Sequence, residues 1–496
     1  MGVEIQQDQF SSEDHARFGR KIRDNLKALQ QLLAQPGFGD GPMSLGAELE
    51  CYLVGNAGRP ANCNQAILQQ MANPQLTPEL NRFNLEYNLS PQPFAGAPFA
   101  AFERDLQHIL VAIEPCAQHL NASLLPIGIL PTLMPGDFNQ QTMTDLHRYR
   151  AMDNALKQLR GGPFQIAIDG DPPLQLQWPD VTLEGANTSF QVHWRIPPAA
   201  FRDSFNAVQL LTPVALALAA NSPYLFGHAL WDETRIALFK QSIDARGDVG
   251  SRERCPPRVY FGNGWLHDGA LELFASTVAL FPPILPVVHP DDPLAQLAQG
   301  ELPALHELKL HQGTTWPWNR AIYDHHDGGH VRIEMRALPA GPSLVDMSAT
   351  AALLIGSALA LRDSMPARMD LLPFKYAERN FYRAAQHGMD ARLLWPSSSQ
   401  VSVVEYPVTE LARRLLPLAG EALVEAGMDS ADVQRLMDNI ALRLDADISG
   451  ARWQRQVTQA LERQGLDRAA ALHGMLQCYQ AGFQSGQSIA QWSTAV

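Results

Sequence analysis

A short stretch of alternating charged and apolar residues, HVRIEMRAL at 330–338, carries the clearest chemical signal in the sequence. In an extended strand successive side chains point to opposite faces, so Arg332, Glu334 and Arg336 would share one face and apolar residues the other. A carboxylate between two guanidinium groups could hold a metal ion beside bound phosphate. It could also belong to a ladder of ion pairs exposed on an antiparallel sheet. Taken alone, this stretch favours the exposed ladder.

Three other segments, at 44–54, 82–91 and 188–196, predict strands with the same division into a polar and an apolar face. Two carboxylates two residues apart on one face repel each other unless a cation lies beside them. Carboxylates suit Mg²⁺, and imidazole can complete a mixed site for Mn²⁺. We therefore predict a metal site on one face of an antiparallel sheet whose other face packs on the core. The polar faces carry Glu48 and Glu50, then Asn84, Glu86 and Asn88, then Gln191, His193 and Arg195.

Familiar nucleotide-binding and hydrolase motifs are absent from the sequence. There is no GxxxxGK[ST] loop, no glycine-rich dinucleotide fingerprint, no HExxH and no GxSxG. If a nucleotide binds, metal ions and arginines must hold its phosphates in place of a glycine loop. Such a platform suits phosphoryl transfer, in which catalysis is mostly positioning and charge neutralisation.

Composition limits the class of protein. The 496 residues carry a net charge of −13, which argues against binding to nucleic acid or to an anionic membrane surface. Five scattered cysteines and an N-terminal segment without an apolar core favour a reducing cytoplasm over secretion. No apolar run reaches the ~18 residues that span a membrane, and the longest candidates, at 207–220 and 349–361, predict buried helices.

Helical periodicity and strand alternation divide the chain in two. We predict an ATP- and metal-binding catalytic domain at 1–347 and a mainly helical region at 348–496, in which periodicity indicates helices throughout. This second region could serve in a homo-oligomer. In the first region RVYFGNGWL predicts a strand pair around a turn, and 270–300 reads as irregular. Helices are expected at 12–35, 99–121, 142–156, 200–220 and 229–244.

Five motifs, in the same order over about residues 40–350, resemble the glutamate–cysteine ligase family. This family belongs to the wider group of glutamine synthetase-like carboxylate–amine ligases, and the resemblance is closest to its plant and proteobacterial type. Plant-type members carry Asn near position 193, whereas bacterial carboxylate–amine ligases have His, so the subfamily stays open. The motifs are GAELE at 46–50, NLEYNLSPQPFAGAP at 84–98, TSFQVHW at 188–194, ANSPYLFG at 220–227 and RIEMRALPAGPS at 332–343.

The resemblance implies an α+β fold with an antiparallel half-barrel, where ATP enters at one end and amino acids at the other. Two or three Mg²⁺ or Mn²⁺ ions would lie between them. Glu48 and Glu50 would bind two different ions, with Glu86 as a further ligand. His193 and Glu334 would complete the ion nearest the transferred phosphate.

The resemblance also implies roles for residues that do not bind metal. Arg332 and Arg336 would contact the phosphates, and Arg235 would bind a substrate carboxylate. Gln191, and with it Asn88 and Arg195, would face ATP or the substrate. The implied reaction is ATP-dependent: a carboxylate, with glutamate expected, becomes an acyl phosphate that an amino acid or amine converts to an amide.

Two alternatives use the same platform: a metal-dependent phosphotransferase, and a non-catalytic relative that binds ligand. A protein that only binds a partner through acidic strand faces is a further alternative. The amine acceptor stays unassigned, because its pocket would be built from loops such as 131–141, 245–256 and 311–326, which the sequence does not place.

Overall fold

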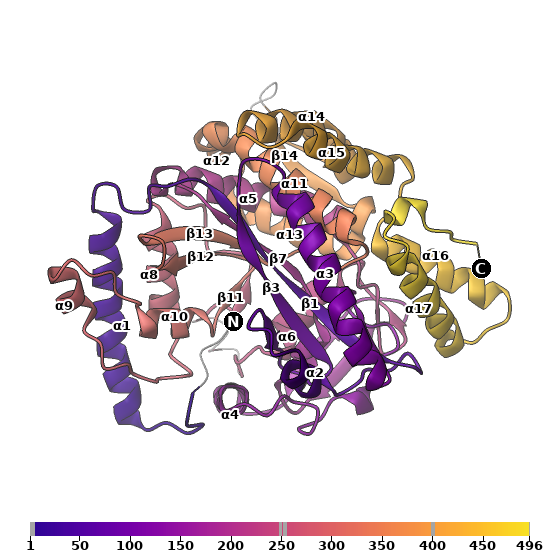
Figure 1. The fold of residues 1–496 in the computed structure, drawn as a ribbon, viewed down its shortest axis with the longest axis horizontal. Coiled ribbons are helices and arrows are strands. Elements are labelled where there is room, and N and C mark those ends of the chain that lie inside the picture. The colour runs from indigo at the N-terminus through magenta and orange to yellow at the C-terminus, as the bar shows by residue number, and fades with distance from the viewer. Residues whose placement is uncertain (1–4, 248–249, 251–254, 398–401, 496) are drawn as a thin grey trace.

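A seven-stranded antiparallel sheet forms the centre of the computed structural model, which describes residues 5–247, 250, 255–397 and 402–495 (Figure 1). The strands lie in the order β12-β13-β7-β1-β3-β2, and β4 pairs with the last residues of β1. This half-barrel with flanking helices is the α+β class that the sequence predicted. The strands are β1 (Ser44–Gly55), β2 (Leu76–Pro78), β3 (Asn84–Pro93), β4 (Ala122–Leu125), β7 (Phe190–Arg195), β12 (Asn319–Asp324) and β13 (His330–Met335).

The register of the sheet brings the four predicted polar faces together. His193 on β7 lies opposite Glu334 on β13, and Glu48 on β1 lies opposite Gln191 on β7. On the other side of β1, Glu50 lies opposite Glu86 of β3. Residues directly opposite in an antiparallel pair have their side chains on the same face. One continuous polar face therefore crosses β13, β7, β1 and β3.

A register irregularity between β1 and β3 falls where the polar face begins. Leu45 pairs with Gln92 whereas Ala47 pairs with Leu89, so β3 contains one extra residue at Ser90–Pro91. Proline lacks the N–H that a ladder needs, and a bulge is one of the few places in a sheet where it fits. Beyond the bulge the register is regular, and Glu48 lies opposite Asn88 and Glu50 opposite Glu86.

Helices cover the apolar face of the sheet. Helix α3 packs on β3, α5 packs on β12 and β13, and α11 packs on α5 and α3 (Figure 1). One stretch, Leu344–Leu371, is long and apolar enough to cross a membrane, and 78% of its most apolar window is buried inside the protein. The sequence reading that no run was long enough is thus corrected, and the burial is that of a core helix.

The remaining helices flank this core. α1 packs with α8, α9 and α10 on one side, and α14 and α15 pack on each other and on α11 (Figure 1). The helices are α1 (Ser12–Leu33), α2 (Asn64–Met71), α3 (Pro98–His119), α4 (His147–Arg160), α5 (Pro198–Ala219), α6 (Thr234–Ser242), α8 (Ala270–Leu280), α9 (Pro293–Ala298), α10 (His306–Gln312), α11 (Leu344–Leu361), α12 (Met365–Leu371), α13 (Phe374–His387), α14 (Val408–Glu425), α15 (Ser430–Asp445), α16 (Gly450–Arg463) and α17 (Arg468–Gln484).

Three expectations about smaller elements were wrong. The region after 348 is not helical throughout, because β14 (Arg392–Ser397) and β15 (Ser402–Pro407) form an antiparallel pair. RVYFGNGWL forms no strand pair of its own: β10 (Val259–Tyr260) pairs in parallel with β11 (Trp316–Pro317), from a distant segment. Residues 270–300 contain α8 and α9. Two further pairs, β5 (Phe164–Ile168) with β6 (Leu174–Trp178) and β8 (Tyr224–Leu225) with β9 (His228–Ala229), complete the strands.

A buried carboxylate at the start of α11 joins distant parts of the chain. The side chain of Asp346 accepts hydrogen bonds from Asn439 of α15 at 3.1 Å and from the Ser488 hydroxyl at 2.7 Å. It also accepts from the backbone N–H of Ile489 at 2.8 Å and from the Ser343 hydroxyl at 2.6 Å. The charge is thus satisfied by donors from three segments.

Candidate active site

Glu48, His193 and Glu334 form a buried group on the polar face of the sheet, drawn from β1, β7 and β13. One potential ligand atom from each lies within 4.8 Å of the other two. The Nε2 atom of His193 is 3.1 Å from Oε1 of Glu48 and 3.7 Å from Oε1 of Glu334. Even so, neither His193 Nε2 nor Glu48 Oε1 has a partner with hydrogen-bond geometry among the described residues. Two buried ligand atoms thus face each other without satisfying each other.

Arg332 donates a hydrogen bond to the ring of His193 and so favours one tautomer of the imidazole. Its Nε–H donates to Nδ1 of His193 at 3.1 Å, and its Nη1 donates to Asp324 at 3.0 Å. A neutral imidazole that accepts at Nδ1 carries its proton on Nε2. Binding of a cation at Nε2 therefore requires the proton to move to Nδ1 and the Arg332 donor to turn away. Metal binding at this group and the position of Arg332 are coupled.

Two arginines hold the carboxylate of Glu334. Arg320, directly opposite on β12, donates from Nε to Oε2 and from Nη2 to Oε1 at 3.1 Å. Nη1 of Arg336 is 3.4 Å from Oε2. Burial alone would raise the pKa of Glu334, yet Arg320 and Arg336 lower it below its ordinary value. Glu334 is therefore ionised at neutral pH.

Glu50, Glu79 and Glu86 form a second acidic group beside the first. Their ligand atoms also lie within 4.8 Å of one another, although Glu50 and Glu86 stand directly opposite on β1 and β3, where like charges repel. Thr77 and Asn88 each donate to Glu86 at 2.8 Å, so Asn88 supports a carboxylate. Burial alone would raise the pKa of Glu86, but these hydrogen bonds help to lower it below its ordinary value.

The other two carboxyl groups of this cluster resist ionisation. Burial, followed by the charge of Glu86, raises the pKa of Glu50 to about 7. The same causes raise the pKa of Glu79 well above its ordinary value. Nearby Glu184 has its pKa raised to about 8 by burial and by Glu79. Such a concentration of acids is stabilised most directly by a cation.

Gln191 joins the acidic group to an arginine. Its Nε2 donates to Oε1 of Glu50 at 2.8 Å, while its Oε1 accepts from Nη1 of Arg336. The backbone N–H of Ser189 donates to the other oxygen of Glu50 at 2.6 Å. The Nε atom of Arg336 is buried and has no hydrogen-bond partner in the described part of the chain. Arg336 thus sits between both carboxylate groups with one donor still available.

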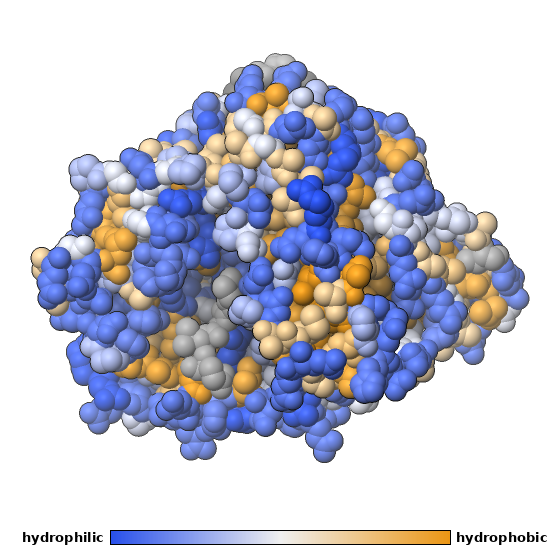
Figure 2. Space-filling view, viewed as in Figure 1, coloured by the Kyte–Doolittle hydropathy of each residue, from blue (hydrophilic) through white to orange (hydrophobic). Residues whose placement is uncertain are grey.

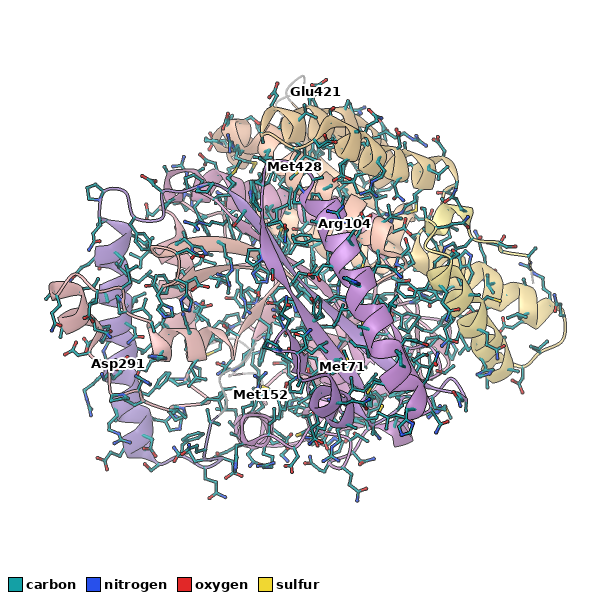
Figure 3. All side chains as sticks on the ribbon, viewed as in Figure 1. Met71, Arg104, Met152, Asp291, Glu421 and Met428 are labelled. Carbon is teal, nitrogen blue, oxygen red and sulfur yellow. The ribbon has the colours of Figure 1, made fainter. Side chains whose placement is uncertain are left out.

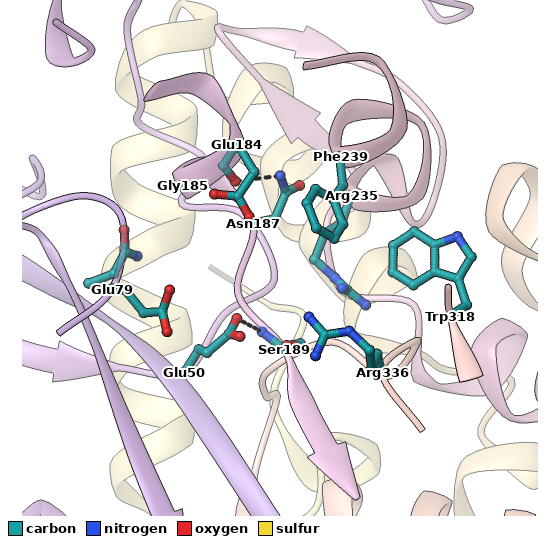
Figure 4. Close-up of a pocket in the computed structure, with 11 residues that line it drawn as sticks. Glu50, Glu79, Glu184, Gly185, Asn187, Ser189, Arg235, Phe239, Trp318 and Arg336 are labelled. Atoms are coloured by element: carbon teal, nitrogen blue, oxygen red, sulfur yellow. Dashed lines mark hydrogen bonds between the residues drawn. The ribbon is translucent and has the colours of Figure 1, made fainter. Parts of the chain in front are cut away.

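A cavity of about 30 Å³ opens beside these residues, large enough for ions or water but not for a nucleotide. Figure 4 shows Glu79 and Glu50 on one side and the side chains of Arg235 and Arg336 opposite them. On the outer surface, Figure 2 shows a hollow between the part that holds α1 and the part that holds α3. The cavity is lined by Glu50, Glu79, Asn84, Glu184, Gly185, Asn187, Ser189, Arg235, Phe239, Trp318 and Arg336.

Two of the predicted residues are placed differently from the rest. Arg235 lines the cavity but is buried and paired with Glu233 at 2.9 Å, and its guanidinium lies over the Trp318 ring. Arg195 stands opposite Arg332 and Ser44 at the end of β7, outside both acidic groups. Of the suggested acceptor loops, residues 248–249 and 251–254 lie outside the described residues.

Sequence reasoning missed three residues that the fold brings to the site: Glu79, Glu184 and Arg320. Glu79 precedes β3 in a loop, and Glu184 lies in a short 3₁₀ segment, so neither belongs to an alternating strand. Arg320 does alternate with apolar neighbours in NRAIYD, and that pattern could have identified it. Loop residues reach the site only through tertiary contacts, which periodicity does not report.

The donor sets fit divalent cations. Carboxylate oxygens with one imidazole suit Mg²⁺ or Mn²⁺, and the unpartnered atoms of Glu48 and His193 mark a place for a ligand. A second carboxylate group beside it contains acids whose raised pKa values would fall next to a cation. Glu48 belongs to the first group and Glu50 to the second, although they are only two residues apart on β1.

Comparison with known proteins agrees with this geometry. Residues 44–252 match the family model of glutamate-cysteine ligase family 2 (GCS2), which confirms the family resemblance and the expectation of a ligase that forms carbon–nitrogen bonds. No curated protein sequence matches the chain significantly.

Among solved structures, the glutamate–cysteine ligase from Francisella tularensis in complex with AMP shares the fold. Its TM-score is 0.56 with 12% identity, over 90% of this chain and 89% of that one. A bifunctional glutathione synthetase from Pasteurella multocida has a TM-score of 0.48 with 12% identity, over 93% of this chain and 54% of that one. The complex of the ubiquitin-like protein Pup with its ligase PafA gives 0.37 with 8% identity, over 88% and 72%.

Proposed function

We propose, for a chain that contains a glutamate–cysteine ligase family region and shares that fold, an ATP-dependent ligation of a carboxylate to an amine through an acyl phosphate. The observation that carries this proposal is the pair of carboxylate groups, Glu48–His193–Glu334 and Glu50–Glu79–Glu86, on one sheet face with Arg336 between them. Phosphoryl transfer from ATP to a carboxylate brings together many negative charges, and this face is built to hold cations among them.

Divalent cations, when bound, would offset the charge of the phosphates and of the incoming carboxylate. We propose one ion for each group, as Mg²⁺ or Mn²⁺. Glu334 is kept ionised by Arg320, so it is ready to act as a ligand at neutral pH. Arg332 would give up its hydrogen bond to Nδ1 of His193 and donate to a phosphate oxygen instead. Nδ1 could then take the proton that must leave Nε2 before an ion binds there. Arg336 would contribute its unpartnered Nε–H to the phosphoryl group.

The charged side chains around the cavity, and not its enclosed volume of about 30 Å³, support a small amino acid as the carboxylate substrate. Acidic residues line one wall and Arg235 and Arg336 the opposite wall, an arrangement that suits a molecule with both an ammonium and a carboxylate. Glutamate is the proposed acid, and an amino acid or amine is the acceptor, giving a γ-glutamyl amide. The carboxylate takes the γ-phosphoryl group, ADP leaves, and attack by the amine on the acyl carbon releases phosphate and a proton.

The deciding experiment measures phosphate release from ATP with Mg²⁺ or Mn²⁺ over a panel of acids and amines. Release that requires both an acid and an amine is expected. ADP formed without any amine, with a phosphorylated acid as the stable product, would instead show a phosphotransferase. ATP binding without turnover across the whole panel would overturn the ligase proposal in favour of a binding protein.

Replacement of Glu334 tests the residue at the centre of the site. Glu334→Ala should lower metal-dependent turnover by at least about 10³-fold, since it removes a ligand and leaves Arg320 and Arg336 without their carboxylate. Glu421→Ala, on the exposed side of α14 (Figure 3), is the matched control and should keep full activity. Full turnover in Glu334→Ala, with unchanged circular dichroism, would contradict the assignment.

A further inference from the structure

A cluster of two histidines and an aspartate lies on the opposite side of the molecule from the helical C-terminal region. His289 and Asp291 belong to the loop between α8 and α9, and His306 begins α10. Asp291 is at the edge of the molecule near α1, away from the sheet (Figure 3). One ligand atom from each residue lies within 4.8 Å of the other two, and the three side chains are half-exposed.

The spacing of the three side chains is that of ligands around one ion. Nδ1 of His289 is 3.2 Å from Oδ2 of Asp291, and Nε2 of His306 is 3.5 Å from the same oxygen. In a tetrahedral site with bonds of about 2.0–2.2 Å, neighbouring ligand atoms are about 3.4 Å apart. The imidazole rings lie face to face with centroids 3.8 Å apart, so both present an edge to the same carboxylate.

The backbone around the cluster is fixed by a buried carboxylate. Oε1 of Glu307 accepts the backbone N–H of His289 at 2.8 Å, and Oε2 accepts from Asn25 of α1 at 2.9 Å. Lys21, also on α1, donates to the backbone carbonyl of Asp291. Glu307 follows His306 directly in the chain, so one side chain sets the distance between both histidines. Ligands held in this way lose little conformational entropy when an ion binds.

Among the described residues, the rings of His289 and His306 are paired with Asp291, and no lysine or arginine is hydrogen-bonded to either ring. The group Asp324–His325–His326 differs in this respect. There Nζ of Lys309 is 3.2 Å from Nδ1 of His325, and Arg332 is paired with Asp324. Lys309 and Arg332 therefore already lie where a metal ion would bind in that group.

We propose that His289, Asp291 and His306 form a second metal site, separate from the sheet, that binds a zinc-class cation. Two imidazoles and one carboxylate favour Zn²⁺ or Cu²⁺ over Mg²⁺, which prefers an all-oxygen shell. Three protein ligands leave a fourth position for water. The ion would join the α8–α9 loop to α10 and so to α1. The site stands apart from the proposed ligase reaction.

The test uses the full-length protein, first freed of metal and then saturated with Mg²⁺. Zn²⁺ titration by calorimetry should show one site in the wild type. In His306→Phe, which keeps the stacked ring but removes both nitrogens, the affinity should fall at least about tenfold. His289→Asn should act in the same way. His326→Asn, an exposed histidine of the other group, is the matched control and should bind Zn²⁺ like the wild type.

Copper spectroscopy separates this site from the catalytic face. Electron paramagnetic resonance of one equivalent of Cu²⁺ should show coupling to two imidazole nitrogens, because the group on the sheet offers only His193. The signal should persist in Glu334→Ala and disappear in His306→Phe. Zinc affinity unchanged in both histidine variants, or a copper signal with a single nitrogen in the wild type, would overturn the proposal. Loss of ligase activity alone would leave these readouts unaffected.

Discussion

At the scale of single residues, the polar face of the sheet carries carboxylates that repel each other until a cation binds. Glu50 and Glu86 face each other across β1 and β3, and Glu79 adds a third carboxylate from a loop. Burial, followed by the charge of Glu86, raises the pKa values of Glu50 and Glu79. Positions selected for stability alone would not gather one buried and two half-buried acids in one place, so this arrangement trades stability of the metal-free protein for affinity toward cations.

Glu79→Gln should therefore separate stability from function. With a chelator at pH 7.5, the free energy of unfolding of the variant is expected to exceed that of the wild type by about 1 kcal/mol, because folding no longer has to protonate this carboxyl or hold it ionised beside Glu50 and Glu86. Its metal-dependent phosphate release should fall. Urea unfolding followed by circular dichroism measures the first effect. A less stable chelated variant would contradict the repulsion that we describe.

Arg332→Gln tests the coupling between this arginine and the histidine. The change removes the donor on Nδ1 of His193 and one positive charge near the carboxylates, and both effects favour a cation at Nε2. The half-saturating Mn²⁺ concentration should fall several-fold, while turnover falls because a phosphate contact is lost. Arg17→Gln, on the exposed face of α1, is the control. Weaker Mn²⁺ binding in Arg332→Gln would show that the arginine supports the ion instead.

At the scale of elements, alternation was a reliable guide to the strands of the site. The segments at 44–54, 82–91, 188–196 and 330–338 correspond to β1, β3, β7 and β13 within a few residues. Each has a fully apolar second face, so only one register buries it. The sequence could not show which strands are neighbours, because pairing is decided by contacts between segments far apart in the chain.

The short strands and the loop residues of the site could not be predicted for a related reason. β10 and β11 have two residues each and pair across more than fifty residues of sequence. Glu79 and Glu184 reach the site from loops, where no period exists to reveal the direction of a side chain. Roles inferred from the family resemblance, such as metal ligation by Glu334 and phosphate contact by Arg332, remain predictions that the variants above address.

The attachment of α11 to α15 gives a prediction at the element scale. Asp346→Ala should lower the free energy of unfolding by about 3 kcal/mol or more, since it leaves buried donors of Asn439, Ser488 and Ile489 without an acceptor. Denaturant unfolding gives the value. Asp438→Ala, at an exposed position of α15, should change stability by less than about 0.5 kcal/mol. Equal effects in the two variants would contradict the role of the buried network.

At the scale of the whole molecule, α1, α8 and α10 form a unit beside the sheet with a buried histidine inside it. Nε2 of His311 in α10 lies 3.1 Å from the carbonyl oxygen of Thr277 in α8, and its ring lies near Phe18 of α1. Burial lowers the pKa of His311 to about 4. The neutral ring is therefore part of the packing, and protonation would work against it.

The pH dependence of stability should reveal this histidine. The unfolded chain takes up a proton near pH 6.5, whereas folded His311 does so only near pH 4, so the free energy of unfolding falls as the pH drops through this window. His311 accounts for up to about 3 kcal/mol of that loss. His311→Gln should have a shallower slope between pH 6.5 and 4.5 in urea titrations, and His326→Gln an unchanged one. Parallel curves for His311→Gln and the wild type would refute the assignment.

The carboxylate of Asp346 also imposes an order on how the protein can form in the cell. Two of its four donors belong to Ser488 and Ile489, more than 140 positions later in synthesis than Asp346 itself. While the ribosome is still adding the last helices, the start of α11 must keep water around a charge that the finished protein buries. The core around α11 therefore cannot close until the end of translation, and nascent chains stalled before residue 488 should remain sensitive to protease in α11.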